Sequence, residues 1–214
     1  MTDRPILFSA PMVRALIEGR KSQTRRPLYV VRNMKETGEL PPSRYFPDYP
    51  PPHLGLNQIA TLGTAHLIQP GDRLWVKETW RTMSGADGLK PTALNTDCRI
   101  EYLATPEGLA EGKTRVSLFM RRWMSRLTLT VTDVRIERLQ DISREDAIAE
   151  GIQRVGGGML RWENWSGAEG QSGSSPQAAY GLLWNSINGA GSWNANPWVV
   201  RICFAVEMRN IDHV

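Results

Sequence analysis

The stretch Leu127-Thr-Leu-Thr-Val-Thr-Asp-Val-Arg-Ile-Glu-Arg-Leu139 alternates apolar and polar residues along almost its whole length. In a β-strand successive side chains point to opposite faces, so this alternation is typical of a strand with one buried face. The phase of the alternation breaks at Thr132-Asp133, which is where an extra residue would produce a β-bulge. The stretch therefore predicts one long strand with a bulge near Asp133.

The segments on either side predict a mixed set of short elements. Shorter strands are expected at 4–8, 73–78, 99–103 and 198–208, and helices are expected after Ser9, Ser143 and Ser175, ending near Gly19, Gly151 and Gly189. Two long irregular insertions are expected, at about 33–70, which is rich in proline, and at about 154–175, which is rich in glycine and serine.

The order of these elements bears on the fold class. Because irregular segments connect the strands, and regular helices do not, the order argues against a doubly wound parallel sheet. We expect a single α+β domain over residues 1–214, built on a mostly antiparallel sheet or small β-barrel and decorated with short helices.

Composition narrows the class of protein. The chain has 214 residues, with 26 Lys and Arg against 22 Asp and Glu, which gives a net charge of +4. This mild basic excess permits a nucleic-acid partner without requiring one. Cys98 and Cys203 form no CxxC pair and the histidines are scattered, so neither a metal site nor a disulfide framework is expected, and no cofactor.

No apolar stretch is long enough to cross a bilayer, and the first residues lack the pattern of a signal peptide. We therefore expect a cytoplasmic protein with no membrane partner. The oligomeric state stays open.

The basic run Gly19-Arg-Lys-Ser-Gln-Thr-Arg-Arg26 is the first candidate site and is predicted to be a turn that leaves a helix. A lysine in low-dielectric surroundings loses its proton more readily and then acts as a base or nucleophile, so Lys21 is the candidate reactive amine. Thr24 is placed to orient a water molecule, and Arg25 and Arg26 are placed to hold an anion. The alternative is that these cations only complement the negative end of the helix.

Glu78 is the second candidate, because it follows a predicted strand between Trp75 and Trp80. Aromatic neighbours remove water from a carboxylate and raise its proton affinity, which suits general acid–base catalysis. The alternative is a plain ion pair with a nearby cation.

Arg121, Arg122 and Trp123 form a third candidate, because arginines next to an aromatic ring hold phosphates and stack a base. A solvated entrance to a strand is the alternative. The tryptophans and asparagines of 184–198 indicate either a stacking pocket or core tryptophans beside a capped turn.

Several motifs together resemble the ASCH family. The spacing Gly19-x-Lys21-x-x-x-x-Arg26 matches the GxKxxxxR motif of that family, and the segments PGDRLWV-x-ETW, LQDIS-x-EDAIAEGI and LWNSINGxGSW-x-NPW are similar to those of phage and prophage ASCH-type proteins. The resemblance covers most of the chain outside the two insertions. It implies a PUA-like β-barrel and a protein encoded by a phage or prophage and acting in a bacterial cell.

The resemblance also implies a function. Small amidohydrolases of the family remove the acetyl group from N(4)-acetylcytidine without a metal, using a lysine, a threonine and a glutamate that correspond to Lys21, Thr24 and Glu78. Other members bind or cleave RNA. This chain is longer and continues as Arg25-Arg26-Pro27 after the threonine, where the small enzymes have a strand-like segment.

We therefore expect a metal-independent amidohydrolase acting on an acylated cytidine. The alternatives are a non-catalytic module that binds RNA, or with less support DNA, and a ribonuclease. The residues expected to hold the nucleoside or nucleic acid are Arg25, Arg26, Trp75, Trp80, Arg121, Arg122 and Trp123.

Overall fold

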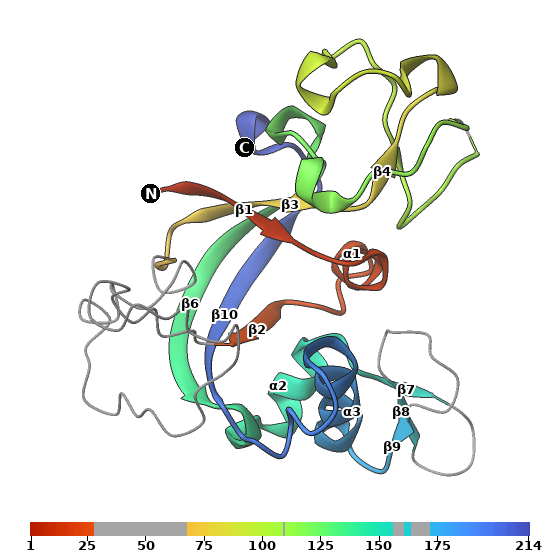
Figure 1. Cartoon of the computed structure of the whole chain (residues 1–214). Helices are drawn as coiled ribbons and strands as arrows, with labels where there is room; N and C mark the ends of the chain where they lie inside the picture. Colours follow the sequence, from red (N-terminus) through yellow and green to blue (C-terminus); the bar gives the residue numbers. More distant parts are fainter. Residues whose placement is uncertain (28–67, 109, 156–160, 164–171) are drawn as a thin grey trace, which may run out of the picture.

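A five-stranded sheet organises the molecule, which a computed structural model describes over residues 1–27, 68–108, 110–155, 161–163 and 172–214. The strand order is β1-β3-β6-β10-β2 (Figure 1). β1 and β3 are parallel, and the other neighbours are antiparallel. The predicted α+β class is confirmed, with a mixed sheet. The strands are β1 (Asp3–Leu7), β2 (Gln23–Pro27), β3 (Arg73–Lys77), β6 (Thr128–Arg138) and β10 (Trp198–Glu207).

β6 is the long strand that the alternating stretch predicts, and it lies in the middle of the sheet. Its register with β10 shifts between Cys203 and Phe204, whose partners are Asp133 and Val131. One residue, Thr132, is therefore extra on β6. The predicted bulge near Asp133 is confirmed.

The three predicted helices are present as α1 (Ala10–Ile17), α2 (Arg144–Ala149) and α3 (Pro176–Asn188). The Ser143 and Ser175 side chains accept hydrogen bonds from the first turns of α2 and α3, at 3.0 and 3.1 Å. Ser9 makes no such bond at the start of α1. Gly19 follows the end of α1, and its φ of 71° lies in the left-handed region that glycine adopts without steric cost.

The basic run differs from its prediction as a turn. Gln23–Pro27 is an edge strand, β2, which pairs with β10 through residues 199–203. The turn prediction is wrong for this half of the run because β10 offers hydrogen-bond partners that the local sequence does not reveal. Pro27 is tolerated there because β2 lies at the edge of the sheet.

The core consists of separate apolar clusters. The main cluster joins α1 to one face of the large sheet, and a second joins α2 and α3 to Val199 of β10. The segment 79–126 follows β3, contains β4 (Trp80–Arg81) and β5 (Glu101–Tyr102), and packs around a third cluster beyond the end of β3 (Figure 1). The third cluster comprises Trp80, Leu94, Met120 and Met124.

The structure describes the two predicted insertions to different extents. The first lies almost wholly outside the described residues. In the second, the described residues form β7 (Gln153–Val155), β8 (Arg161–Glu163) and β9 (Ser172–Gly173), which make a three-stranded sheet. The prediction of irregular structure is therefore wrong for these residues, because pairing with neighbouring strands overrides their weak local preferences.

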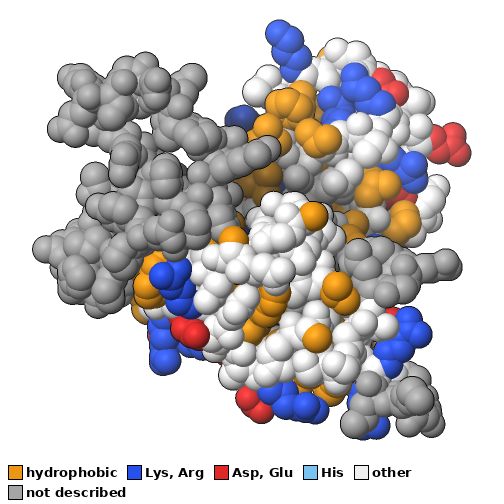
Figure 2. Space-filling model, turned by 60° about the horizontal axis from the view of Figure 1, so that its bottom comes forward, with side chains coloured by type: hydrophobic (Ala, Val, Ile, Leu, Met, Phe, Trp, Pro, Cys, Tyr) orange, Lys and Arg blue, Asp and Glu red, His pale blue; other side chains and the backbone are white. Residues whose placement is uncertain are grey.

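The surface near α3 is almost neutral. α3 contains no charged residue, and in Figure 2 the basic and acidic side chains gather at the edges of the face turned toward the viewer. None of the described helices is long and apolar enough to cross a membrane.

Candidate functional site

Lys21 lies at the junction of α1, β2 and α2. The chain turns back at the end of α1, where the backbone N–H of Lys21 donates to the carbonyl of Ala15 at 3.0 Å. Lys21 then forms an isolated β-bridge with Glu150, the residue that caps α2. Its Nζ donates to Glu150 Oε2 at 2.7 Å and to the Glu150 carbonyl at 3.1 Å. The two side chains are only 1% and 3% exposed, so this is a fully buried ion pair.

Burial lowers the pKa of the Lys21 ammonium below its usual 10.5, because the charged form loses its hydration. The Glu150 carboxylate acts in the opposite direction, and the positive charges of Arg26 and Arg25 add to the lowering. A lysine in this position exchanges its proton more readily than one on the surface.

Each nitrogen of the Arg25 guanidinium contacts a carboxylate. Its guanidinium contacts Glu137 of β6 at 2.7 Å, and Asp146 and Glu150 of the α2 segment at 2.9 and 3.1 Å. These contacts hold β2, β6 and α2 together. Its placement differs from the expectation of an anion-binding residue, because every side of the guanidinium faces a carboxylate of the protein.

A small cavity of about 40 Å³ opens beside this ion-pair network. Its polar lining comes from Thr24, Arg25, Arg26, Glu150, Tyr180 and Asn188, and its apolar lining comes mainly from α3. The Thr24 hydroxyl makes no hydrogen bond to any residue that the structure describes. A polar cavity of this size accommodates water, whereas a whole nucleoside does not fit.

The Tyr180 hydroxyl donates a long hydrogen bond, 3.5 Å, to Glu150 Oε1. Burial raises the pKa of this phenol well above its usual value, and the nearby Glu150 charge raises it further. Tyr180 therefore stays protonated and remains a hydrogen-bond donor at the cavity.

Glu78 has a different partner from Lys21. Its carboxylate accepts two hydrogen bonds from Arg126, at 2.9 and 3.0 Å, and the Arg126 guanidinium lies 4.1 Å from the centre of the Tyr102 ring. Burial raises the pKa of Glu78, and Arg126 opposes that rise. Among the described residues no hydrogen bond or ion pair joins Glu78 to Lys21. The structure thus brings Lys21 and Thr24 to one place and gives Lys21 the carboxylate of Glu150.

Glu150 is the residue that sequence reasoning missed. It stands 129 positions after Lys21, so nothing in the local pattern connects the two. A faint signal was available, because Glu150 directly precedes the glycine that ends α2, within a segment that carries the family resemblance.

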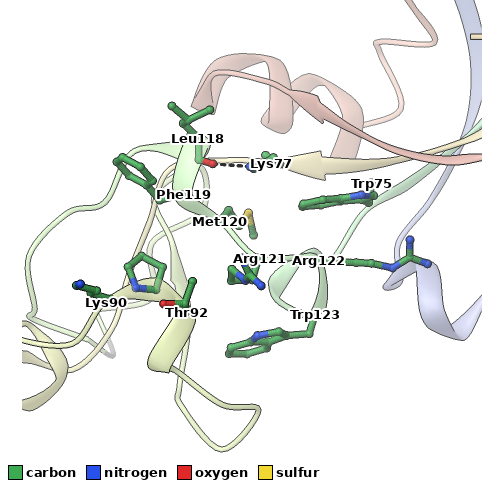
Figure 3. A pocket seen from close by; sticks show the side chains of 11 residues that line it. Trp75, Lys77, Lys90, Thr92, Leu118, Phe119, Met120, Arg121, Arg122 and Trp123 are labelled. Carbon is green, nitrogen blue, oxygen red and sulfur yellow. Dashed lines mark hydrogen bonds between the residues drawn. The ribbon is translucent and has the colours of Figure 1, made fainter. Parts of the chain in front are cut away.

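The remaining predicted residues divide between the core, the small cavity, which Arg26 lines, and a groove. Trp80 is fully buried, with the Arg115 guanidinium 5.3 Å from its ring centre, so it offers no face for stacking a base. Arg26 donates to the Leu7 carbonyl at 2.7 Å. The others, Trp75, Arg121, Arg122 and Trp123, line a groove of about 630 Å³ (Figure 3).

No group of three or more His, Cys, Asp or Glu side chains with the arrangement of a metal site occurs in the part of the chain that the structure describes. Comparison with known proteins gives no match to a family model, to a curated protein or to a solved structure.

Proposed function

We propose that the protein is a metal-independent amidohydrolase acting on an N(4)-acylated cytidine, whose acyl group enters the cavity beside Lys21 while the nucleoside stays outside it. The observation that carries the proposal is the buried Lys21–Glu150 pair, 2.7 Å apart, next to the unbonded hydroxyl of Thr24. The resemblance to the ASCH family supports the choice of substrate. The geometry supports assigning to Glu150 the acid–base role that the sequence suggested for Glu78.

The chemistry follows from which groups line the cavity. Glu150 lines it and Lys21 lies behind Glu150, so once Lys21 has released its proton the carboxylate takes a proton from a cavity water and passes it to the Lys21 amine. The water oxygen attacks the acyl carbon, and Thr24 orients that water. Tyr180 turns its hydroxyl proton from Glu150, to which its hydrogen bond is long, toward the developing oxyanion. The C–N bond then breaks, the ammonium of Lys21 returns the proton through Glu150 to the leaving amine, and the products are cytidine and a carboxylic acid.

The PUA-like barrel remains part of this proposal. β1 and β2 are the two edges of the large sheet, and the bond from Arg26 on β2 to the Leu7 carbonyl on β1 draws these edges toward each other. This contact supports a sheet that curls toward closure around α1. The resemblance supports the further expectation of a phage or prophage protein that acts in the cytoplasm.

The proposal is tested by incubating the protein with N(4)-acetylcytidine and following the release of cytidine. Lys21→Arg keeps the positive charge but cannot release a proton, so we expect a loss of about a hundredfold or more in rate. Ser22→Ala, at the exposed neighbour of Lys21, is the matched control and should keep the wild-type rate. A Lys21→Arg enzyme as fast as wild type would contradict the proposal.

Thr24 allows a second variant with little effect on folding. Because its hydroxyl is bonded to no described residue, Thr24→Val should change the free energy of unfolding by about 1 kcal/mol or less. It should nevertheless slow the reaction about tenfold or more if the hydroxyl orients the attacking water, and Thr24→Ser should restore the rate. Equal rates for the valine and serine variants would remove Thr24 from the mechanism.

A non-catalytic role is the second candidate, favoured by the small size of the cavity and the complete pairing of Lys21. In that case the ion-pair network only holds α2 against the sheet, and the protein binds a base or an RNA strand. Tight binding of an oligonucleotide without release of cytidine from any acylated substrate would support this candidate. Cleavage of RNA in the same incubations would instead indicate the ribonuclease alternative.

A further inference from the structure

We infer that the groove between the end of β3 and the segment 118–123 is a second binding site, and that it takes a short stretch of single-stranded RNA. With a volume of about 630 Å³, it has the size of a site for a ligand of one or two nucleotides. It is lined by residues of β3, of 90–92 and of 118–123.

The groove presents aromatic surfaces to its interior. Trp75 and Trp123 are half-buried, and in Figure 3 their rings lie on either side of Arg121. Phe119 is 57% exposed at the rim, and the exposed Leu118 lies beside it. Exposed rings over a concave surface are the platforms on which unpaired bases stack.

The groove also carries positive charge that no carboxylate neutralises. Within the described residues, Lys77, Lys90 and Arg121 take part in no ion pair, and none of the groove-lining residues is acidic. Lys77 donates one hydrogen bond to the Leu118 carbonyl and lies 5.4 Å from the centre of the Trp75 ring. Burial lowers the pKa of Lys77 and the charge of Arg121 lowers it further, so the two cations lie close enough to repel. A phosphate between them would relieve this repulsion.

The charged groups next to these three cations differ from them, because each has a partner of opposite charge. Arg122 contacts Asp3 and Asp212, each at 2.6 Å, and in Figure 3 its side chain points away from the groove. Glu78, next to Lys77 in the chain, is occupied by Arg126 and has its backbone N–H against the sulfur of Met120. Among the described residues, none of these carboxylates forms an ion pair with Lys77, Lys90 or Arg121.

The combination of stacking rings and unpaired cations indicates a single strand, because in a duplex the faces of the bases are already stacked. The choice of RNA over DNA rests on the proposed function, whose substrate is a cytidine ribonucleoside. A buried contact connects the two regions: the Phe8 ring lies 5.8 Å from Lys21 Nζ, and the Phe8 N–H donates to the Lys77 carbonyl at 3.0 Å.

The test is fluorescence anisotropy with a labelled, unmodified single-stranded RNA, with the DNA of the same sequence and the RNA duplex as comparison probes. Wild-type protein should bind the single-stranded RNA more tightly than either. Arg121→Gln should weaken binding and reduce the slope of log affinity against log salt by about one. Phe119→Ala, at an exposed position, and Trp123→Leu should each weaken binding about tenfold through lost stacking.

Arg135→Gln is the matched control for loss of one positive charge, since Arg135 is 66% exposed on β6 and pairs with Asp133. It should bind RNA like wild type. The proposal that the groove binds single-stranded RNA would be wrong if the Arg121 and Phe119 variants bound this RNA as tightly as wild type does. It would also be wrong if wild-type protein bound duplex RNA as tightly as single-stranded RNA. Equal affinity for DNA would overturn the choice of RNA.

The unmodified RNA contains no acyl group, so binding and hydrolysis fail separately. If the protein releases cytidine from N(4)-acetylcytidine but binds no RNA, the proposed RNA site in the groove is wrong and the proposed hydrolysis stands. A protein that binds RNA through Arg121 and Phe119 but hydrolyses no acylated cytidine overturns the proposed function and leaves the groove.

Discussion

At the scale of the residue, the cost of burying Lys21 is the dominant physical fact about the candidate site. An ammonium inside a protein is stabilised only by a close partner, and Glu150 supplies two acceptors, its carboxylate and its backbone carbonyl. Removing one member of such a pair leaves the other charged and unpaired. The same burial that makes the pair costly makes the proton of Lys21 available for exchange.

The pH dependence of stability should report the Lys21 proton. Because the folded-state pKa lies below 10.5, the unfolded chain binds more protons between these two values, and the free energy of unfolding rises with pH through that window. Lys21→Met removes this titration and should flatten the rise. Denaturant titrations from neutral to alkaline pH measure it, and equal slopes in both proteins would show that Lys21 keeps an ordinary pKa.

The free energy of unfolding should change with pH in the opposite direction where Glu78 titrates. Its folded-state pKa lies above 4.5, so the folded protein binds more protons between 4.5 and that value, and the free energy of unfolding falls as pH rises through this window. Glu78→Gln should abolish that fall and cost about 1–3 kcal/mol at neutral pH, because it weakens the charged hydrogen bonds to Arg126. Chemical denaturation from acidic to neutral pH tests both parts; an unchanged fall in the variant would assign it to another group.

At the scale of the element, the position of α3 against the segment after it decides the apolar wall of the cavity. Gly181 of α3 faces the indole of Trp193, and the Trp193 ring in turn meets Tyr180 edge-on, with centroids 6.2 Å apart. Tyr180 lines the cavity beside Glu150. A glycine on a helix thus sets how closely an aromatic ring supports the candidate site.

Gly181→Ala should therefore destabilise the protein. The added Cβ would lie 2.9 Å from Cδ2 of Trp193, so the ring must move, at a cost of about 1–3 kcal/mol. Gly85→Ala is the matched control, because no atom lies within 4 Å of its Cβ position, and it should stay within about 0.5 kcal/mol of wild type. Thermal or urea unfolding compares them; equal stability of the two variants would mean that Trp193 yields without cost.

At the scale of the whole molecule, the two proposed sites belong to different cores. The cavity beside Lys21 abuts the cluster of α2 and α3, whereas the groove lies over the smaller cluster around Trp80. The large sheet connects the two regions (Figure 1). Binding at the groove and chemistry at the cavity are thus carried by separately packed parts of one chain.

Amide hydrogen exchange should reveal this division. β6 and β10 are paired over ten residue positions in the middle of the sheet and should exchange slowest. The segment 79–105 has the short β4–β5 pairing, one β-bridge from Trp80 to Arg115 and a small cluster, so its amides should exchange faster through local opening. Uniform protection across both regions would show one cooperative unit.

Much of the fold was predictable because the relevant forces act between residues near one another in the chain. The alternation in 127–139, the bulge near Asp133 and the serine and glycine limits of the helices all depend on such short-range effects. The strand β2 was missed because its pairing with β10 joins residues far apart in the sequence.

For the candidate site, the sequence by itself determined which residue types were available: a lysine and a threonine in a basic run, and arginines and tryptophans around 75 and 121–123. Only the tertiary structure decided their partners. It paired Lys21 with Glu150 and buried Trp80 and Arg25, and among the described residues it gave Lys77 and Arg121 no carboxylate partner. The physical reason is that burial and charge pairing depend on distance in space, and the sheet brings together residues that the chain keeps more than a hundred positions apart.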